Sequence, residues 1–386
     1  MSELLTSRWS ETKEALLEGL QGTKKSVMGV TLENTKKYLQ ESATAGATSA
    51  GNVATLNRVI LPVIRRVMPT VIANELVGVQ PMTGPVGQIH TLRVRYADTS
   101  SNAGVTAGEE ALSPFKIAEG YSADSTGRAV STATLEGQAG KRMSIQILKQ
   151  TVEAKTRKLS ARWTFEAAQD AQAQQGIDIE AEVMAALAQE ITAEIDQEIL
   201  ASLLSLAGSA VETFDQNAVS GTATFVGDEH AALAVQINRV SNLIAQRTRR
   251  GAGNWAVVSP YALTILQSAT TSAFARTTEG TFEAPTNTKL VGTLNNAMKV
   301  YVNTYATDTT DILIGYKGSS ESDAAAFYCP YIPLMSSGVV LDPSTFEPVV
   351  SFITRYGYVE LTNTASSLGN AADYLGRIAI SNVSFK

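Results

Sequence analysis

The stretch IDIEAEVMAALAQEITAEIDQEILASLLSLA, residues 177–207, predicts one long amphipathic helix around which the rest of the chain is organised. Apolar residues recur in it every four positions, and a helix with about 3.6 residues per turn places such residues on one slowly drifting stripe. A helix of this length extends about 45 Å, so other elements must pack along it. The predicted core face consists of Ile179, Val183, Leu187, Ile191, Ile195, Ile199 and Leu203.

The other faces of this predicted helix are acidic and carry no lysine or arginine. They contain Asp178, Glu180, Glu182, Glu190, Glu194, Asp196 and Glu198. Helix carboxylates can build a di-metal site, but that site needs Glu-x-x-His pairs on facing helices, and this stretch has no histidine. We therefore interpret these residues as a solvated face, with a carboxylate-metal enzyme as the alternative from another functional class.

Composition excludes several kinds of protein. The length of 386 residues allows two or three domains, and a net charge of −6 argues against a chain that wraps nucleic acid. One cysteine, Cys329, excludes an internal disulfide, and two histidines, His90 and His230, leave little for zinc or imidazole chemistry. The polar N-terminal residues predict no secretory signal, and charges interrupt the most apolar early run, so we predict no membrane span.

No motif for nucleotide binding or hydrolysis is present. The sequence Gly251-Ala252-Gly253 is half of a dinucleotide fingerprint, but it follows a predicted helix and precedes a predicted strand, the reverse of the required order. Cys329 lies between Tyr328 and Pro330 and reads as a packed thiol. We predict no enzymatic activity, no catalytic residue, no metal and no cofactor.

Residues 97–140 are rich in Ala, Gly, Ser and Thr and have few large apolar residues. A structureless loop of this length is unusual inside a compact domain. We predict instead a long hairpin that leaves the body through residues 93–98 and returns through 141–148. Such an arm cannot bury itself, so we expect it to rest on another subunit.

Residues 1–41 predict two charged amphipathic segments around a soft stretch at Gln21–Gly29, and SATAGATSAGN, residues 42–52, predicts a flexible joint. The second half of the chain predicts an α/β body followed by strands that return to the long helix. The predicted elements of this half are helices at 229–250 and 260–267 and strands at 255–258, 299–303, 312–316, 325–328, 349–361 and 377–383.

Two stretches carry a family resemblance. ANELVGVQPMTGPVGQIHTLRVRY (73–96) and VEAKTRKLSARWTFEAAQDAQAQQGIDIEAEVMAALAQEITAEIDQEI (152–199) resemble segments of the major capsid proteins of T-even-type myoviruses. Similar segments follow in the family's order: GAGNWAVVSP (251–260), IGYKG (314–318), DAAAFYCPYIPL (323–334) and FEPVVSFITRYG (346–357). The resemblance therefore extends over most of the chain.

The resemblance implies the Hong Kong 97-type capsid fold, which is α+β. Its implied parts are an N-terminal arm (1–60), a first part of the peripheral domain (61–85), an extended loop (86–145), the peripheral domain with its spine helix at 177–207 (146–208), an axial domain (209–345) and a return to the peripheral domain (346–386). The implied inter-subunit contacts of the extended loop involve Arg93, Arg95, Glu109, Glu110 and Arg128.

The implied function is a major capsid protein that assembles as hexamers into the icosahedral or prolate head of a tailed bacteriophage. The shell would enclose double-stranded DNA without sequence-specific binding, as part of a virion assembled in the host cytoplasm. Expected partners are a pentameric vertex protein, a portal, a scaffold, a prohead protease and decoration proteins, with no membrane. An encapsulin-like shell around an enzyme cargo is the alternative within the fold.

Proteins of this family are commonly trimmed by a prohead protease after Glu in a Leu/Ile-x-Glu context. Leu39-Gln40-Glu41 fits that pattern and precedes the predicted joint, whose exposed backbone suits a protease. Two outcomes stay open at this point. Residues 1–41 are removed on maturation, or they persist as a clamp on neighbouring subunits.

Overall fold

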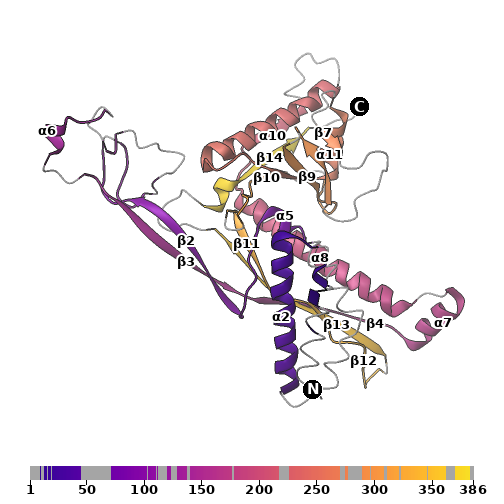
Figure 1. The fold of residues 1–386 in the computed structure, drawn as a ribbon. Coiled ribbons are helices and arrows are strands. Elements are labelled where there is room, and N and C mark those ends of the chain that lie inside the picture. The colour runs from indigo at the N-terminus through magenta and orange to yellow at the C-terminus, as the bar shows by residue number, and fades with distance from the viewer. Residues whose placement is uncertain are drawn as a thin grey trace. The chain divides into compact units, whose positions relative to one another are not determined.

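The computed structural model (Figure 1) divides the chain into two compact units that both contain helices and sheets, which confirms the predicted α+β class. Unit 1 comprises residues 1–87, 152–199 and 327–359, and unit 2 comprises 88–151, 200–326 and 360–386. The described residues are 9, 13–14, 16–18, 20–44, 71–101, 103–109, 111, 120–122, 128–136, 140–175, 178–216, 226–269, 274–276, 289–295, 297–307, 311–320, 323–345, 347–361 and 370–382.

Unit 1 is built on a five-stranded sheet that contains β13 (Pro348–Glu360). β13 pairs antiparallel with β4 (Lys155–Arg162) and with β12 (Val340–Leu341), and it neighbours β11 (Ala326–Ser336). The short β1 (Gly78–Val79) pairs in parallel with β11. Residues of β11 are buried at nearly every position, so this strand lies at the centre of the unit, as its continuous apolar sequence favours.

The predicted long helix is present as α8 (Ile179–Leu206), preceded by α7 (Phe165–Gln175). Asp178 caps α8, because its carboxylate accepts a hydrogen bond from the Glu180 amide at 3.0 Å. Gly208 follows the helix with a φ of 69°, the left-handed conformation that glycine adopts without strain. The buried stripe positions are Leu187, Ile191, Ile195, Ile199 and Leu203, whereas Ile179 and Val183 are only half-buried.

The structure corrects the prediction for the N-terminal residues. The stretch Gln21–Gly29 is not a soft break, because α2 runs without interruption from Gly22 to Thr44. Val27, Met28 and Leu32 of α2 are buried, and the Asn34 amide donates to the carbonyls of Met82 (2.7 Å) and Tyr331 (2.9 Å). This helix is therefore an integral part of unit 1.

Unit 2 contains a seven-stranded sheet covered by α10 (Val226–Thr248) and α11 (Pro260–Ser268). Leu233, Ile237 and Ile244 of α10 are fully buried against the sheet, and Ser259 caps α11 as its sequence predicts. The strand order is β5 (Glu212–Asp215), β14 (Leu375–Ser381), β10 (Ile312–Gly315), β6 (Trp255–Val258), β9 (Met298–Val302), β8 (Lys289–Leu294) and β7 (Phe274–Arg276). The short η1 (Ala371–Tyr374) leads into β14.

Gly251 and Gly253 do more than end α10. A Cβ atom on Gly251 would lie 2.6 Å from the ring of Tyr316, and one on Gly253 would lie 2.9 Å from Ile314. These contacts are too short for any side chain, so β10 and its continuation pack directly on the glycine backbone. The glycine pair is a packing feature of unit 2 rather than part of a nucleotide site.

Two predicted domain boundaries are wrong. The body predicted at 209–345 includes β11, but β11 pairs in the sheet of unit 1. The return segment predicted at 346–386 includes β14, but β14 lies between β5 and β10 in the sheet of unit 2. An apolar strand fits the core of either unit equally well, and pairing with residues distant in sequence decides between them.

Candidate assembly surfaces

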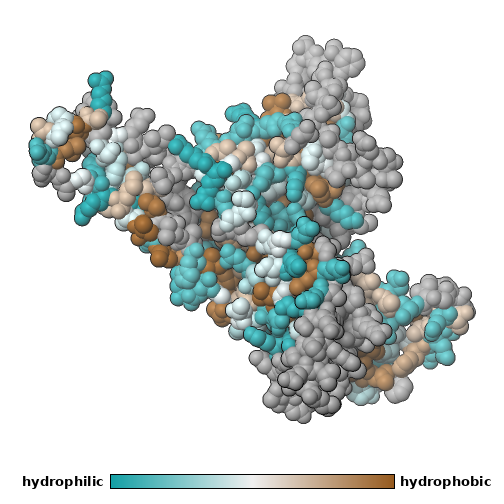
Figure 2. Space-filling model, viewed as in Figure 1, coloured by the Kyte–Doolittle hydropathy of each residue, from teal (hydrophilic) through white to brown (hydrophobic). Residues whose placement is uncertain are grey.

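The predicted hairpin is present as the two-stranded sheet of β2 (Val86–Tyr96) and β3 (Met143–Glu153). Met143, Ile145 and Ile147 alternate along β3 and therefore share one face of the strand. Their exposed fractions are 53%, 69% and 66%, and Figure 2 shows hydrophobic surface along the hairpin. We call these three residues the apolar stripe. Contiguous exposed apolar residues of this kind mark interaction surfaces on soluble proteins.

Beyond these strands the hairpin carries a small core of its own, contrary to the prediction that the arm cannot bury itself. The core consists of Tyr96, Val105, Ala111 and Tyr121, and the two tyrosine rings lie 4.5 Å apart. The Tyr121 hydroxyl donates to the carbonyl of Arg142 at 2.7 Å, and the Lys141 ammonium lies 5.5 Å from the Tyr121 ring. The apolar stripe is therefore adjacent to a folded element.

An ion pair joins the residues that follow β2 and precede β3. The Arg142 guanidinium lies 3.1 Å from the Asp98 carboxylate, and the Arg142 amide donates to the same carboxylate at 2.8 Å. These hydrogen bonds lower the pKa of Asp98. Because the Arg142 side chain is exposed and Asp98 is only half-buried, solvent screens the pair and its contribution to stability is small.

The described residues among those predicted for inter-subunit contacts differ in their exposure. Arg95 is 7% exposed, so its side chain has little surface left for a neighbouring subunit. Glu109 is half-buried and its carbonyl accepts from the Tyr96 amide, whereas the Arg128 side chain is exposed. The side chain of Arg93 and all of Glu110 lie outside the described residues. Charge in a polar loop does not reveal which way a side chain points, so charge alone could not predict these differences in exposure.

The acidic residues of α8 are not a uniform solvated face. The Arg157 guanidinium of β4 lies 2.7 Å from Glu194 and 2.5 Å from Glu198, and its Nε donates to the Tyr356 hydroxyl of β13 at 2.7 Å. Burial lowers the pKa of Arg157, but its hydrogen bonds to Glu198 and Tyr356 raise the pKa by more, so the net shift is upward. One guanidinium therefore ties two strands of the sheet to α8, which a lysine with a single ammonium could not reproduce.

Asp196 also departs from the predicted solvated acidic face, because this residue is only 3% exposed. Its carboxylate accepts a hydrogen bond from the amide of Ile72 at 2.9 Å. Burial raises the pKa of Asp196 to about 7, and the Ile72 hydrogen bond opposes that rise. A second row spaced by four residues is buried beside the predicted stripe, and it consists of Met184, Ala188, Thr192, Asp196 and Leu200. That row is the sequence signal by which Asp196 could have been placed inside.

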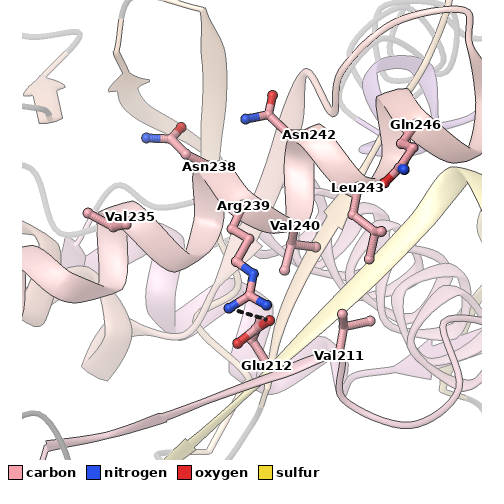
Figure 3. Close-up of a pocket in the computed structure, with 9 residues that line it drawn as sticks. All are labelled: Val211, Glu212, Val235, Asn238, Arg239, Val240, Asn242, Leu243 and Gln246. Atoms are coloured by element: carbon pink, nitrogen blue, oxygen red, sulfur yellow. Dashed lines mark ion pairs between the residues drawn. The ribbon is translucent and has the colours of Figure 1, made fainter.

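A shallow groove of about 760 Å³ lies on unit 2 beside α10 and the start of β5. In Figure 3, Arg239 extends toward Glu212, and an ion pair of 3.2 Å joins the two side chains across the groove. The lining residues are Val211, Glu212, Val235, Asn238, Arg239, Val240, Asn242, Leu243 and Gln246. The polar side chains in this lining are the carboxamides of Asn238, Asn242 and Gln246 and the ion pair of Arg239 with Glu212. Such groups can form hydrogen bonds to a partner, but they do not form an arrangement for proton transfer or nucleophilic attack.

The described residues contain neither a metal site nor a reactive thiol. Among them, no three His, Cys, Asp or Glu side chains lie close enough together to hold a metal ion. Cys329 is buried in β11, and burial raises the pKa of its thiol to about 12, so the thiolate is not formed near neutrality. Within the part of the chain that is described, no helix is both long and apolar enough to cross a membrane.

Comparison with known proteins gives one consistent result. The family model for the major capsid protein Gp23 matches residues 53–380. A major capsid protein of Vibrio phage KVP40 is 30% identical to this chain, over 85% of this chain and 81% of the relative. The major capsid protein of Enterobacteria phage T4 is 28% identical, over 83% and 78% respectively.

Solved structures similar to the chain also come from phages. A structure from Mycobacterium phage Bobi matches with a TM-score of 0.48 and 13% identity, over 80% of this chain and 90% of that one. The capsid of Myoviridae phage XM1 matches with a TM-score of 0.45 and 10% identity, over 79% and 90%.

Proposed function

Because the chain belongs to the Gp23 family of major capsid proteins, we propose that its β2–β3 hairpin lies on a neighbouring copy of the same chain in the shell. The protein is a shell-forming component of the virion of a tailed phage. The observation that carries the proposal is the apolar stripe of Met143, Ile145 and Ile147, because three large apolar side chains on one strand face lose contact with water only against a partner.

The surface of the neighbour that receives the hairpin must match this chemistry. Lys141 and Lys149 flank the apolar stripe, so a complementary surface combines exposed apolar area with carboxylates. The exposed Phe165 of α7, with the exposed Glu166 and Asp170 beside it in sequence, offers that combination on a second copy of the chain. We infer that repeated contacts of this kind produce hexamers in a Hong Kong 97-type lattice.

The wild-type chain alone tests this proposal. Purified protein is expected to form shells, tubes or hexagonal sheets in negative-stain electron microscopy, because a heterologous contact between two different surfaces of the same chain repeats from copy to copy. Six-fold averages are expected within the sheets. A chain that stays monomeric or dimeric at every concentration and salt condition contradicts assembly through the hairpin. In infected cells we further propose a pentameric vertex protein, a portal, a scaffold, a prohead protease and decoration proteins as partners.

We also propose that a prohead protease cuts after Glu41. Leu39 and Glu41 lie in the last turns of α2, so the protease must unwind the end of that helix before cleavage. Cleavage releases a segment whose residues Val27, Met28 and Leu32 pack inside unit 1, which makes trimming a change in the core of the subunit. Intact-mass spectrometry of chains from DNA-filled particles is expected to find Ser42 at the N-terminus. A chain that starts at Met1 or Ser2 refutes the cleavage.

A further inference from the structure

Asp196 is a buried carboxylate that joins two parts of unit 1 distant in sequence. Its hydrogen-bond partner is the amide of Ile72, which is 124 residues away along the chain. Ile72 immediately precedes α5 (Ala73–Leu76), and its own apolar side chain makes no capping hydrogen bond to that helix. The Asp196 carboxylate therefore satisfies a helix N-terminal amide that would otherwise have no acceptor.

The segment that contains Ile72 is packed almost completely. Its buried residues are Val71, Ile72, Ala73, Leu76 and Val77, and α5 leads directly into β1 of the unit 1 sheet. One further contact holds the segment on its polar side, where the Lys24 ammonium of α2 lies 2.6 Å from the Glu75 carboxylate. Because Lys24 and Glu75 are partly exposed, this ion pair is screened by solvent, and Asp196 provides the buried polar contact.

We propose that Asp196 is a proton-controlled latch that holds the segment Val71–Val77 against α8. With the latch closed, Asp196 lies out of water and the neutral acid is favoured. With the latch open, the carboxylate is hydrated and the ionised form is favoured. A proton therefore stabilises the closed state, and losing it favours release of the segment.

The described groups around Asp196 keep their charge between pH 5 and 8, so Asp196 is the titrating residue among them. Tyr328 and Cys329 of β11 and Tyr356 of β13 stay neutral there, because burial raises the pKa of each, to about 12 for Cys329 and Tyr356. On α8 itself, Glu198 pairs with Arg157; burial raises its pKa, but the hydrogen bonds from Tyr356 and Arg157 lower it overall. None of these groups changes charge in the range in which the latch operates.

The direction of the pH effect follows from linkage. Burial raises the pKa of Asp196 from its ordinary value of 3.8 to about 7 in the closed state. The extra stability of the closed state is then fully present below pH 3.8, is lost as the pH rises from there to about 7, and stays constant above. Within that window, the ratio of open to closed states increases about tenfold per pH unit.

Hydrogen exchange of the purified full-length chain tests the latch. Protection of the amides of Val71–Val77, corrected for the intrinsic pH dependence of exchange, is expected to fall about tenfold per pH unit between pH 5 and 7 and then level off. The amides of β13 serve as the internal reference and are expected to stay constant. Constant protection of Val71–Val77 across this range overturns the proposal, and this measurement needs no variant.

Two substitutions on α8 identify the group responsible. Asp196→Asn keeps the acceptor for the Ile72 amide but cannot ionise. In this variant the amides of Val71–Val77 are therefore expected to be strongly protected from exchange at every pH. Glu190→Gln removes an exposed carboxylate of the same helix and is expected to retain the wild-type pH profile. A wild-type profile in Asp196→Asn assigns the effect to another group and refutes the latch. Because exchange is read within one subunit, the result is independent of whether the hairpin drives assembly.

Discussion

The double substitution Ile145→Asp and Ile147→Asp is expected to abolish shell formation and to leave the subunit folded. Both side chains are more than half exposed on β3 and take no part in the small core of the hairpin, so their loss costs the isolated chain little. In the proposed contact the same positions are buried against a neighbour, where each unpaired carboxylate costs several kcal/mol. Since every copy repeats the contact, the penalty applies to each subunit in the lattice.

Size-exclusion chromatography and electron microscopy measure the loss of particles, and circular dichroism during heating measures retention of the fold. The matched control is Ser144→Asp with Gln146→Asp, which places the same two charges at the intervening, exposed positions of β3. The control is expected to assemble. Equal loss of particles in both variants would assign the effect to charge on the hairpin as a whole. Normal particles from the Ile145, Ile147 variant would falsify the role of the apolar stripe.

Replacing Ile191 by Asp is expected to leave no folded subunit. Ile191 is 1% exposed at the middle of the buried face of α8. Removing a large apolar side chain from such a site costs about 2–5 kcal/mol, and burying a carboxylate without a partner adds several more. The sum is comparable to the whole free energy of unfolding of a typical domain, about 5–15 kcal/mol. The variant is expected to be insoluble or to show no cooperative thermal transition.

Two milder substitutions at the same place calibrate the result. Ile191→Val removes one methyl group and is expected to cost about 1 kcal/mol. Glu190→Gln changes the adjacent exposed residue and is expected to leave the melting temperature unchanged. If Ile191→Asp protein is soluble and melts like the wild type, the face that contains Ile191 is not a core face.

Elements whose formation depends on neighbours along the chain could be predicted from the sequence alone. The four-residue spacing predicts α8 because helical hydrogen bonds and side-chain contacts join residues three and four positions apart. Leu187, Ile191, Ile195, Ile199 and Leu203 are buried for this reason. The strand at Trp255–Val258 and the Ser259 cap of α11 are equally local features. The resemblance to T-even-type capsid proteins rests on such local stretches as well, and the family match agrees with it.

Features that need partners from distant parts of the chain could not be predicted in this way. The burial of Asp196 could not be predicted because its partner, the Ile72 amide, is distant in sequence. The contacts of Arg157 on β4 likewise depend on the packing of α8 and β13 beside that strand. β11 belongs to the sheet of unit 1 and β14 to the sheet of unit 2, the reverse of the predicted assignment. The hydrogen bonds of a strand form with other segments of the chain, and the apolar pattern of a strand does not specify which segment that is. The small core of the hairpin forms because Tyr96 and Tyr121 meet across a loop that carries no helical or strand periodicity.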